Sequence, residues 1–277
     1  MRHHLLHHQC PPQAPPAGQH LRLLRRQAGL SQLDLALMAG VSQRHLSCIE
    51  TGRAKASPST LHALLSALGA PLDHCNEVFL AAGFAPRYSA TPFDAPAMEM
   101  VHTAIDHILK ANNPAPAIVI DSNWDVTAAN VSTGLLLAMA GVAQHAASGF
   151  NLLETLLRPG GLGDRLANPQ DVRAAAWQRA SREAVGNPLL AKRLRGLPAP
   201  ALALQAQPAN PVLLTRVYTP EGELSFMSTF TTFGMPLDIT VESLRIEHLI
   251  PADELTRRRM MRAFEQCMSE KHPWQQE

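Results

Sequence analysis

Gln43 and Arg44 stand side by side in this sequence, and Ser47 follows one helical turn later. A glutamine amide can form two hydrogen bonds with the edge of adenine, and an arginine guanidinium can do so with guanine, each pair giving about 1–3 kcal/mol of discrimination. Ser47 can reach a second base or a phosphate. Arg53 and Lys55 are suited to phosphate groups, which position a protein without specifying a sequence. These residue types could therefore bind a nucleic acid through hydrogen bonds and charge pairing, without any change of covalent bonds.

A helix is predicted ahead of this region, from residue 21 to residue 28. Leu21, Leu24 and Ala28 recur on one side at helical spacing, and Gly29 ends the helix. The other side of this helix is predicted to carry the basic residues Arg22, Arg25 and Arg26.

Two further helices are predicted on either side of Gly40. Ser31 is a good N-cap for the first, because its hydroxyl can accept from an orphan backbone N–H of the next turn. The buried stripe of this helix is predicted to consist of Leu33, Ala36 and Leu37. Ser42 caps the second helix, which runs to about Glu50. A helix, a glycine-containing turn and a second helix that enters the major groove make up the helix-turn-helix unit.

The stretch from Leu21 to Phe84 resembles the Cro/C1-type repressors, also called the XRE family. The matching positions are Arg26, Gly29, Ser31-Gln32, Leu35-Ala36, Gly40-Val41-Ser42, Ser47, Ile49-Glu50, Gly52 and Pro58. The resemblance implies an all-α, lambda-repressor-like head of five helices that binds double-stranded DNA. The sequence departs from the family pattern in two small ways. Cys48 lies inside the recognition helix, and residues 54–57 slightly lengthen the loop before Pro58.

Together with the helix geometry, the resemblance implies which side chains contact DNA. They are Gln32, Ser42, Gln43, Arg44, Ser47, Arg53 and Lys55. Gln32 would contact the phosphate backbone and brace the recognition helix. A plain solvent-exposed role is the alternative for Gln32, Arg44 and Lys55. Glu50 is interpreted as structural, paired locally with an arginine.

The basic charge is local. Seven basic and four acidic residues lie between Leu21 and Tyr88, a net charge of +3, whereas the whole chain carries +1. A few phosphate contacts give modest affinity that falls with salt. One module alone would therefore select a genomic site poorly, and we expect a homodimer on two half-sites about one helical turn apart.

Length and composition predict two globular domains, since 277 residues exceed the usual size of one and 46% of them are hydrophobic. No apolar run reaches the roughly 20 residues of a membrane span, and no secretory signal is visible. Four scattered cysteines without C-x-x-C spacing are typical of reduced thiols. We therefore expect a cytoplasmic protein. Motifs of common enzymes are not found, so neither an enzyme nor a metal or cofactor site is expected.

The stretch 1–19 is interpreted as a disordered tail rich in histidine and proline. Its possible soft-metal ligands are His3, His4, His7, His8 and Cys10. A tail that binds nothing, or a mis-assigned start, is the preferred interpretation because no structure would preorganise those ligands. The DNA-binding head is assigned to residues 20–86, and a linker with a connecting helix to residues 87–112.

Residues 113–268 are assigned to the second domain, which begins with strand patterns, and residues 269–277 are assigned to a tail. A hairpin is predicted from Ala117–Ile120 and 124–129, and a second one from 212–218 and 224–233. Helices are predicted at 150–157, 169–185 and after Pro251. This order predicts an α+β domain with an antiparallel sheet and helices packed on one face.

The order of strands and helices resembles a PAS-like sensor domain. More narrowly, residues 117–130 and the later stretch from 230 through 264 resemble the ligand-binding domain of MmyB-like transcriptional regulators. That resemblance implies a fatty-acyl or similar apolar small molecule in the sensor core. Residues 164–211 depart most from the family. Candidate lining residues are Phe150, Leu153, Leu157, Trp177, Leu213, Phe226, Met227, Phe230 and Phe233, with Arg216, Thr231 and Thr232 available for a carboxylate. The alternative for each apolar residue is an ordinary place in the core.

These observations predict a sequence-specific DNA-binding transcriptional regulator with an N-terminal helix-turn-helix head and a C-terminal small-molecule sensor. The second hypothesis keeps the head and makes the C-terminal domain a ligand-free dimerisation or protein-interaction scaffold. A pocket in the sensor core would favour the first hypothesis, and a filled core with an exposed hydrophobic patch would favour the second.

Overall fold

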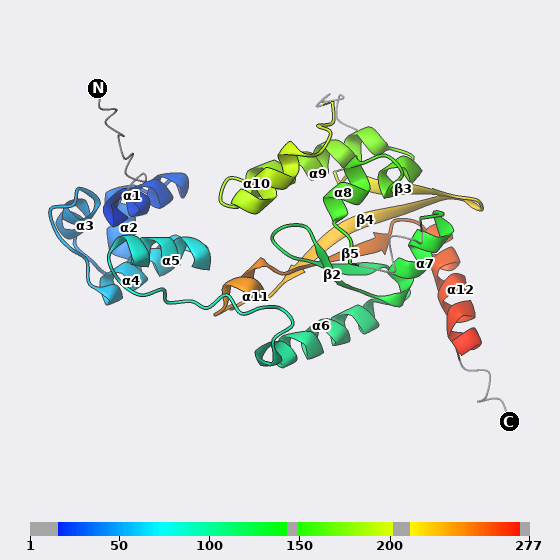
Figure 1. Cartoon of the computed structure of the whole chain (residues 1–277), viewed down its shortest axis with the longest axis horizontal. Helices are drawn as coiled ribbons and strands as arrows, with labels where there is room; N and C mark the ends of the chain where they lie inside the picture. The colour runs from blue at the N-terminus through cyan, green and yellow to red at the C-terminus, as the bar shows by residue number, and fades with distance from the viewer. Residues whose placement is uncertain (1–15, 143–148, 202–210, 272–277) are drawn as a thin grey trace, which may run out of the picture. The chain divides into compact units, whose positions relative to one another are not determined.

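The computed structural model describes residues 16–142, 149–201 and 211–271. They form two compact units (Figure 1). The first unit joins the chain up to Thr91 with Pro236–Glu242, and the second joins Pro92–Met235 with the chain from Ser243 onward. Most of the predicted N-terminal tail, with all of its candidate metal ligands, lies outside the described residues, and so does the stretch from residue 272 to residue 277.

The head of the first unit contains the five expected helices. They are α1 (Ala17–Gln27), α2 (Gln32–Met38), α3 (Gln43–Glu50), α4 (Pro58–Leu68) and α5 (Leu72–Ala81). Ser31 caps α2 as predicted: its Oγ accepts from the Asp34 amide at 3.1 Å, and the Asp34 carboxylate accepts from the Ser31 amide at 3.0 Å. Gly40 takes a φ of 68° between α2 and α3, a conformation that favours glycine.

Two predictions about the head were wrong in detail. Leu33 and Leu37 of α2 are 50% and 72% exposed, whereas Ala36 is buried as predicted and Leu35 is buried with it. Leucines at alternating positions in so short a helix leave its inner face undetermined, and packing against α3 and α4 decides it. Arg25 of α1 is also buried, on the same side of the helix as Leu21.

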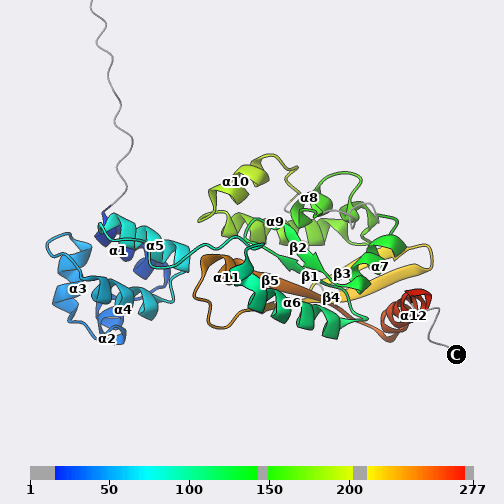
Figure 2. The same ribbon diagram turned by 60° about the horizontal axis from the view of Figure 1, so that its bottom comes forward.

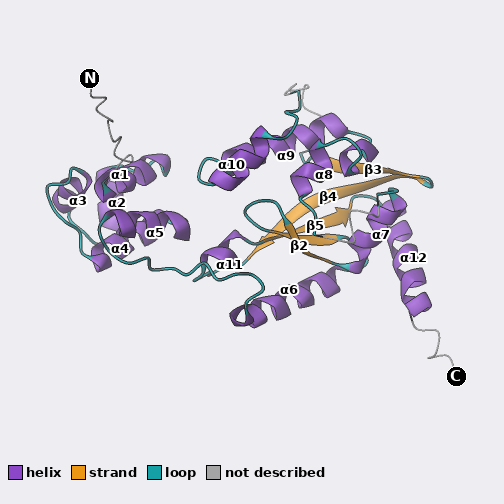
Figure 3. Cartoon of the chain, viewed as in Figure 1, coloured by secondary structure: helices purple, strands orange, loops and turns teal. Residues whose placement is uncertain are grey.

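The second unit is built on one antiparallel sheet of five strands in the order β2-β1-β5-β4-β3 (Figure 3). The strands are β1 (Ala117–Ile120), β2 (Val126–Ala129), β3 (Leu214–Thr219), β4 (Gly222–Thr232) and β5 (Arg245–Pro251). Both predicted hairpins are present. Trp124, expected to start β2, instead lies in the turn with a φ of 66°. The central strand β5 was not predicted.

Helices cover both faces of this sheet (Figure 2). Helices α7 to α10 pack on one face over the larger apolar core, and α6 packs on the other against Val119 and Ile246. The helices are α6 (Glu99–Asn112), α7 (Val131–Met139), α8 (Leu152–Leu157), α9 (Pro169–Glu183), α10 (Pro188–Arg195), α11 (Ile239–Ser243) and α12 (Glu254–Lys271). The expectation of helices on one face was therefore incomplete, because α6, predicted as a connecting helix, covers the second face.

Short 3₁₀ turns lie at Pro96–Met98 and Leu162–Arg165. None of the helices in the described part of the chain is long and apolar enough to cross a membrane.

Candidate nucleic-acid interface and effector site

A buried ionic network ties α3 to α1 and α2. The Arg25 guanidinium donates to both carboxylate oxygens of Glu50, with Nε–Oε1 at 2.6 Å and Nη2–Oε2 at 2.8 Å. Gln32 Nε2 donates to Glu50 Oε2 at 2.8 Å, and Arg25 Nη1 donates to the Leu30 carbonyl at 2.8 Å. Burial alone would raise the pKa of Glu50, but hydrogen bonds from Arg25 and Gln32 more than offset it and hold that pKa below its usual value.

This network fixes the C-terminal end of α3, while Ser42 fixes its N-terminal end. The Ser42 Oγ accepts from the His45 amide at 3.1 Å. Leu46 and Ile49 are buried, which turns Gln43, Arg44 and His45 to the exposed side of the helix. A rigid helix whose first turn presents an amide, a guanidinium and an imidazole has the arrangement needed to read base edges.

The second unit contains a cluster of charged and aromatic side chains where the α9 helix faces the sheet. We call it the interior polar cluster, and it consists of Trp124, Arg179, Glu183, Arg245 and Glu247. Glu183 accepts from the Trp124 indole at 2.8 Å, from Arg179 Nε at 3.0 Å and from Arg245 Nη1 at 2.7 Å. The guanidinium of Arg179 also lies 3.9 Å from the centroid of the Phe230 ring, a cation–π contact.

Within this cluster, Arg245 has donors to spare. Its Nε and Nη2 atoms are buried and have no hydrogen-bond partner in the described part of the chain. Burial raises the pKa of the neighbouring Glu247, against a hydrogen bond from Ser228 and the attraction of Arg179 and Arg245. Unpaired buried donors beside a carboxyl that resists ionisation favour an additional acceptor, supplied by water or by a ligand.

Comparisons with protein families identify both parts of the chain. Residues 17–78 match the model of a helix-turn-helix domain, and residues 101–263 match the model of the MmyB-like transcription regulator ligand binding domain. The second match spans more than half of the chain. This chain belongs to the MmyB-like transcription regulators. The interior polar cluster lies wholly inside the matched ligand-binding domain.

Two solved structures are similar to parts of this MmyB-like regulator. One is the restriction-modification controller protein C.AhdI from Aeromonas hydrophila, 33% identical over 23% of this chain and 91% of that chain, with a TM-score of 0.21. The other is an RNA-binding light-oxygen-voltage receptor, 14% identical over 91% of this chain, with a TM-score of 0.26. The regulator spans 63% of that receptor chain. Among curated proteins, none matches this chain.

The structure brings the sequence-predicted DNA residues of the regulator to the α2–α3 region and the loop after it. Ser42, Arg53 and Lys55 are exposed, as are Gln43 and Arg44. Ser47 is half-buried. The Gln32 amide is half-buried and held by Glu50, so its predicted bracing of α3 is present in the structure. Glu50 is structural and paired with an arginine, as predicted, but its partner Arg25 lies in α1 and is not local in sequence.

His45 was missed by the sequence reasoning, although it is exposed in the first turn of α3 beside Arg44. The signal that could have found it is its position: Leu46 and Ile49 define the buried side of α3, and His45 lies off that side.

The sequence-predicted effector residues do not form one group. Leu153, Leu157 and Phe226 are buried in the larger core, and the partly buried Phe150 and Trp177 pack against it. Leu213 is 41% exposed. Arg216 pairs across the ladder with Ser225 and therefore points to the sheet face opposite to Phe226. There it lies 3.6 Å from Glu223. Phe230 and Thr232 share the Phe226 face and are exposed.

The residues missed are those of the interior polar cluster. Arg245 and Glu247 are on β5, and their ladder partners Thr232 and Phe230 are on β4. The signal was a strand pattern in residues 244–250, where apolar Leu244 and Ile246 alternate with the charged residues.

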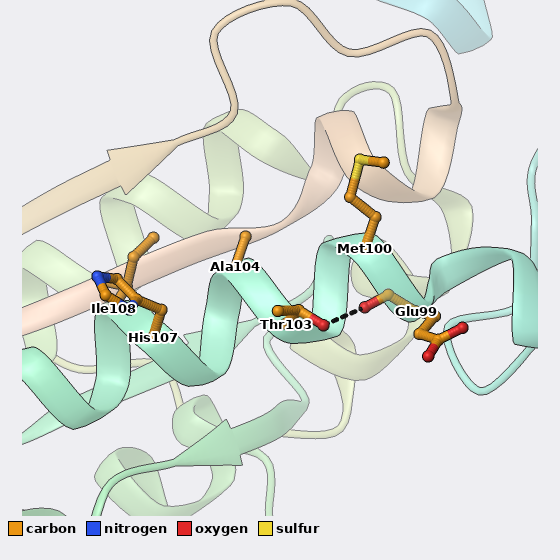
Figure 4. Close-up of a pocket in the computed structure, with 6 residues that line it drawn as sticks. All are labelled: Glu99, Met100, Thr103, Ala104, His107 and Ile108. Atoms are coloured by element: carbon orange, nitrogen blue, oxygen red, sulfur yellow. Dashed lines mark hydrogen bonds between the residues drawn. The ribbon is translucent and has the colours of Figure 1, made fainter.

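An open groove of about 690 Å³ runs along the outer side of α6 (Figure 4). It is lined by Glu99, Met100, Thr103, Ala104, His107 and Ile108, and none of the predicted effector residues takes part. The Thr103 hydroxyl donates a hydrogen bond to the Glu99 carbonyl at 2.9 Å. Within the described residues, no group of three or more His, Cys, Asp or Glu side chains is placed to hold a metal ion.

Proposed function

We propose that this regulator binds operator DNA as a homodimer and that a small, mainly apolar molecule with a carboxylate head group controls its affinity. A DNA-binding helix-turn-helix domain and a family-matched ligand-binding domain on one chain make a transcriptional regulator. The homodimer follows from the small number of DNA contacts that one head can make, because a handful of phosphate and base contacts gives little selectivity.

The observation that carries the effector's class is the pair of unpartnered, buried N–H groups of Arg245. A guanidinium presents parallel N–H groups that match a carboxylate through two hydrogen bonds. The Arg245 side chain is 16% exposed, so an acceptor there would be largely shielded from water. Phe226 and Leu249 lie on the same sheet face as Arg245, so the surroundings of such an acceptor are apolar. A fatty acid or a similar acid fits both requirements.

Mass spectrometry of organic extracts from the purified full-length protein tests this function. Wild type is compared with Arg245→Met, which removes the free donors. The control is Arg216→Met, which removes a guanidinium on the opposite sheet face. We expect a stoichiometric organic acid from wild type and from the control, and none from Arg245→Met. Equal recovery from all three proteins would place the acid elsewhere and contradict the assignment of Arg245.

The scaffold alternative is favoured by one observation, the open groove on α6. Met100 in that groove is 84% exposed and lines it together with Ala104 and Ile108, and a contiguous exposed apolar patch is typical of interaction sites. Under this alternative, Met100→Glu would lower the oligomeric state in size-exclusion chromatography with light scattering, and no organic acid would be extracted from wild type. Recovery of the acid together with an unchanged oligomeric state would exclude the alternative.

DNA binding is tested by selecting an operator from a random duplex library with the full-length protein. Two similar half-sites about one helical turn apart are the expected result. A single short site bound with one protein per duplex would contradict the homodimer.

A further inference from the structure

A stretch of the ligand-binding domain belongs structurally to the DNA-binding unit. Strands β4 and β5 are neighbours in the sheet, and their ladder ends at the pair Thr232 and Arg245. The residues that connect these strands do not stay with the sheet, because Pro236–Glu242 groups by its contacts with the chain up to Thr91. We call this stretch the coupling segment. Both of its ends continue into the two strands that carry Phe230, Arg245 and Glu247.

Asp238 anchors the start of the coupling segment. Its Oδ2 accepts from the Thr91 hydroxyl at 2.7 Å and from the Thr91 amide at 3.1 Å. The Ile239 amide donates to the Ser89 carbonyl at 2.8 Å, so the two stretches form a short parallel bridge. The Asp238 Oδ1 also accepts from the Thr240 amide at 2.8 Å, which starts α11. Burial alone would raise the pKa of Asp238. The hydrogen bonds from Thr91 and from the amides that follow Asp238 more than offset this effect, so the pKa lies below its usual value.

Glu242 anchors the other end, at the first residue of α5. Its Oε2 accepts from the Leu72 amide at 2.8 Å. The residue that precedes α5 is Pro71, whose side chain has no hydrogen-bonding group to cap the helix. The first amides of a helix need acceptors, and a carboxylate there also meets the positive end of the helix dipole. Glu242 therefore supplies, from a distant part of the chain, the cap that the α5 sequence lacks.

Helix α5 is a structural member of the head. It buries Cys75, Val78 and Phe79 in the head core and packs against α1, the helix that carries Arg25. Arg25 in turn holds the end of the recognition helix through Glu50. A continuous set of contacts thus runs from the coupling segment through α5 and α1 to α3.

We propose that the coupling segment is the device by which the ligand-binding sheet controls the DNA-binding head, with Glu242 as the positioning residue at α5. This inference rests on the proposed function for its effector. Occupation of the site at Arg245 changes the β4–β5 ends by displacement or by ordering, and the fit of Glu242 on the α5 N-terminus changes with them. The effector thereby favours one state of the head, as linkage requires.

The first test needs neither effector nor DNA. Hydrogen exchange at the Leu72 amide is measured by mass spectrometry in the full-length protein and in Glu242→Ala, Arg245→Met and the double variant. Loss of the cap in Glu242→Ala should speed this exchange about five-fold, the size of a lost helix cap. Arg245→Met should also change it at least two-fold, and that change should vanish in the Glu242→Ala background.

Two further variants separate capping from general damage to the fold. Glu242→Gln keeps an acceptor oxygen, so exchange at Leu72 should stay within two-fold of wild type. Glu221→Ala, at the exposed turn between β3 and β4, should leave it unchanged. If Arg245→Met leaves Leu72 exchange at the wild-type rate, Glu242 is a structural cap only and the coupling proposal is overturned. Wild-type exchange in Glu242→Ala would overturn it as well, because the cap itself would then contribute nothing.

A second test uses the selected operator, with palmitate as the probe. Palmitate should change the operator affinity of wild type at least five-fold. Glu242→Ala should still bind the operator, but its affinity should respond much less to palmitate. A full palmitate response in Glu242→Ala overturns the coupling proposal. No response in wild type counts against a fatty acid as the effector, and the exchange experiment then decides the coupling independently.

Discussion

Replacing Glu50 with alanine removes the acceptor for three N–H groups in the interior of the head. Two of them are the Nε and Nη2 groups of Arg25, and the third is the Gln32 amide. The alanine variant leaves the arginine charge in place without its counter-ion. It also releases the end of the recognition helix from α1 and α2.

The size of the effect follows from burial. The Arg25 side chain is 9% exposed and that of Glu50 only 1%, so water screens little of the loss. Removing one partner of a buried ion pair destabilises a protein by about 3–5 kcal/mol. Arg25 keeps its bond to the Leu30 carbonyl, so we expect the lower end, about 3 kcal/mol. Since 1.36 kcal/mol corresponds to a factor of ten, this is a change of roughly 150-fold.

Hydrogen exchange of α1 and α3 peptides in the full-length protein is the suitable assay. Tryptophan fluorescence would not follow the head, because Trp124, Trp177 and Trp274 all lie later in the chain. The slowest amides of α1 and α3 should exchange roughly 150-fold faster in Glu50→Ala.

The double variant Arg25→Met with Glu50→Met is the control for this prediction. It should regain most of the lost stability, because an apolar pair of similar volume can replace a buried ion pair at little loss. Less than five-fold acceleration in Glu50→Ala, or a double variant as unstable as the single one, would contradict this role of the Arg25–Glu50 pair.

Three further predictions concern other parts of the molecule. Arg44→Ala should relax base preference at one operator position, which operator selection measures. Lys55→Ala should weaken the binding of all DNA sequences alike and reduce the slope of log K against log salt concentration by about 0.9, which salt titrations measure. Gly18→Ala would place a Cβ 2.2 Å from the Ile49 carbonyl, so α1 must shift away from α3 and the head should lose about 1–3 kcal/mol, measured by exchange in urea. Burial raises the folded-state pKa of Glu247, so its contribution to stability is present at low pH and is lost as pH rises through that raised pKa. Glu247→Gln should therefore gain stability relative to wild type from pH 4.5 upward, and thermal melts followed by tryptophan fluorescence that show a constant difference would contradict this.

Much of the head could be predicted from local signals. Capping serines and glycines at the helix ends are short-range features, and they placed α2 and α3 correctly. The face that α2 buries could not be predicted, because Leu33, Leu35 and Leu37 are equally apolar and only the neighbouring helices choose among them.

The second unit was harder because its central strand β5 carries charged residues on a face of the sheet that is covered by helices. Strand β5 places Arg245 and Glu247 on the face that packs against α9, where an apolar residue would be expected. Its length and its β-branched isoleucines favoured a strand, but charges on the inner face concealed the pattern. The coupling segment was out of reach for a different reason, since its bonds join residues separated by 147 and 170 positions.

Arg25 in the first unit and Arg245 in the second share one physical property. Arg25 lies on the buried face of α1, and Arg245 lies on the inner face of β5, each at a position where the hydrophobic pattern favours an apolar side chain. Burying a guanidinium is unfavourable unless its donors are paired, so such a residue must be offset by specific partners. For Arg25 those partners are Glu50 and the Leu30 carbonyl, and the result is a rigid recognition helix. For Arg245, Glu183 is the partner of Nη1, and Nε and Nη2 have no partner among the described residues, which is why we propose this site for the effector. Departures from the hydrophobic pattern therefore mark both the residues that hold the recognition helix and the residues where we propose that the effector binds.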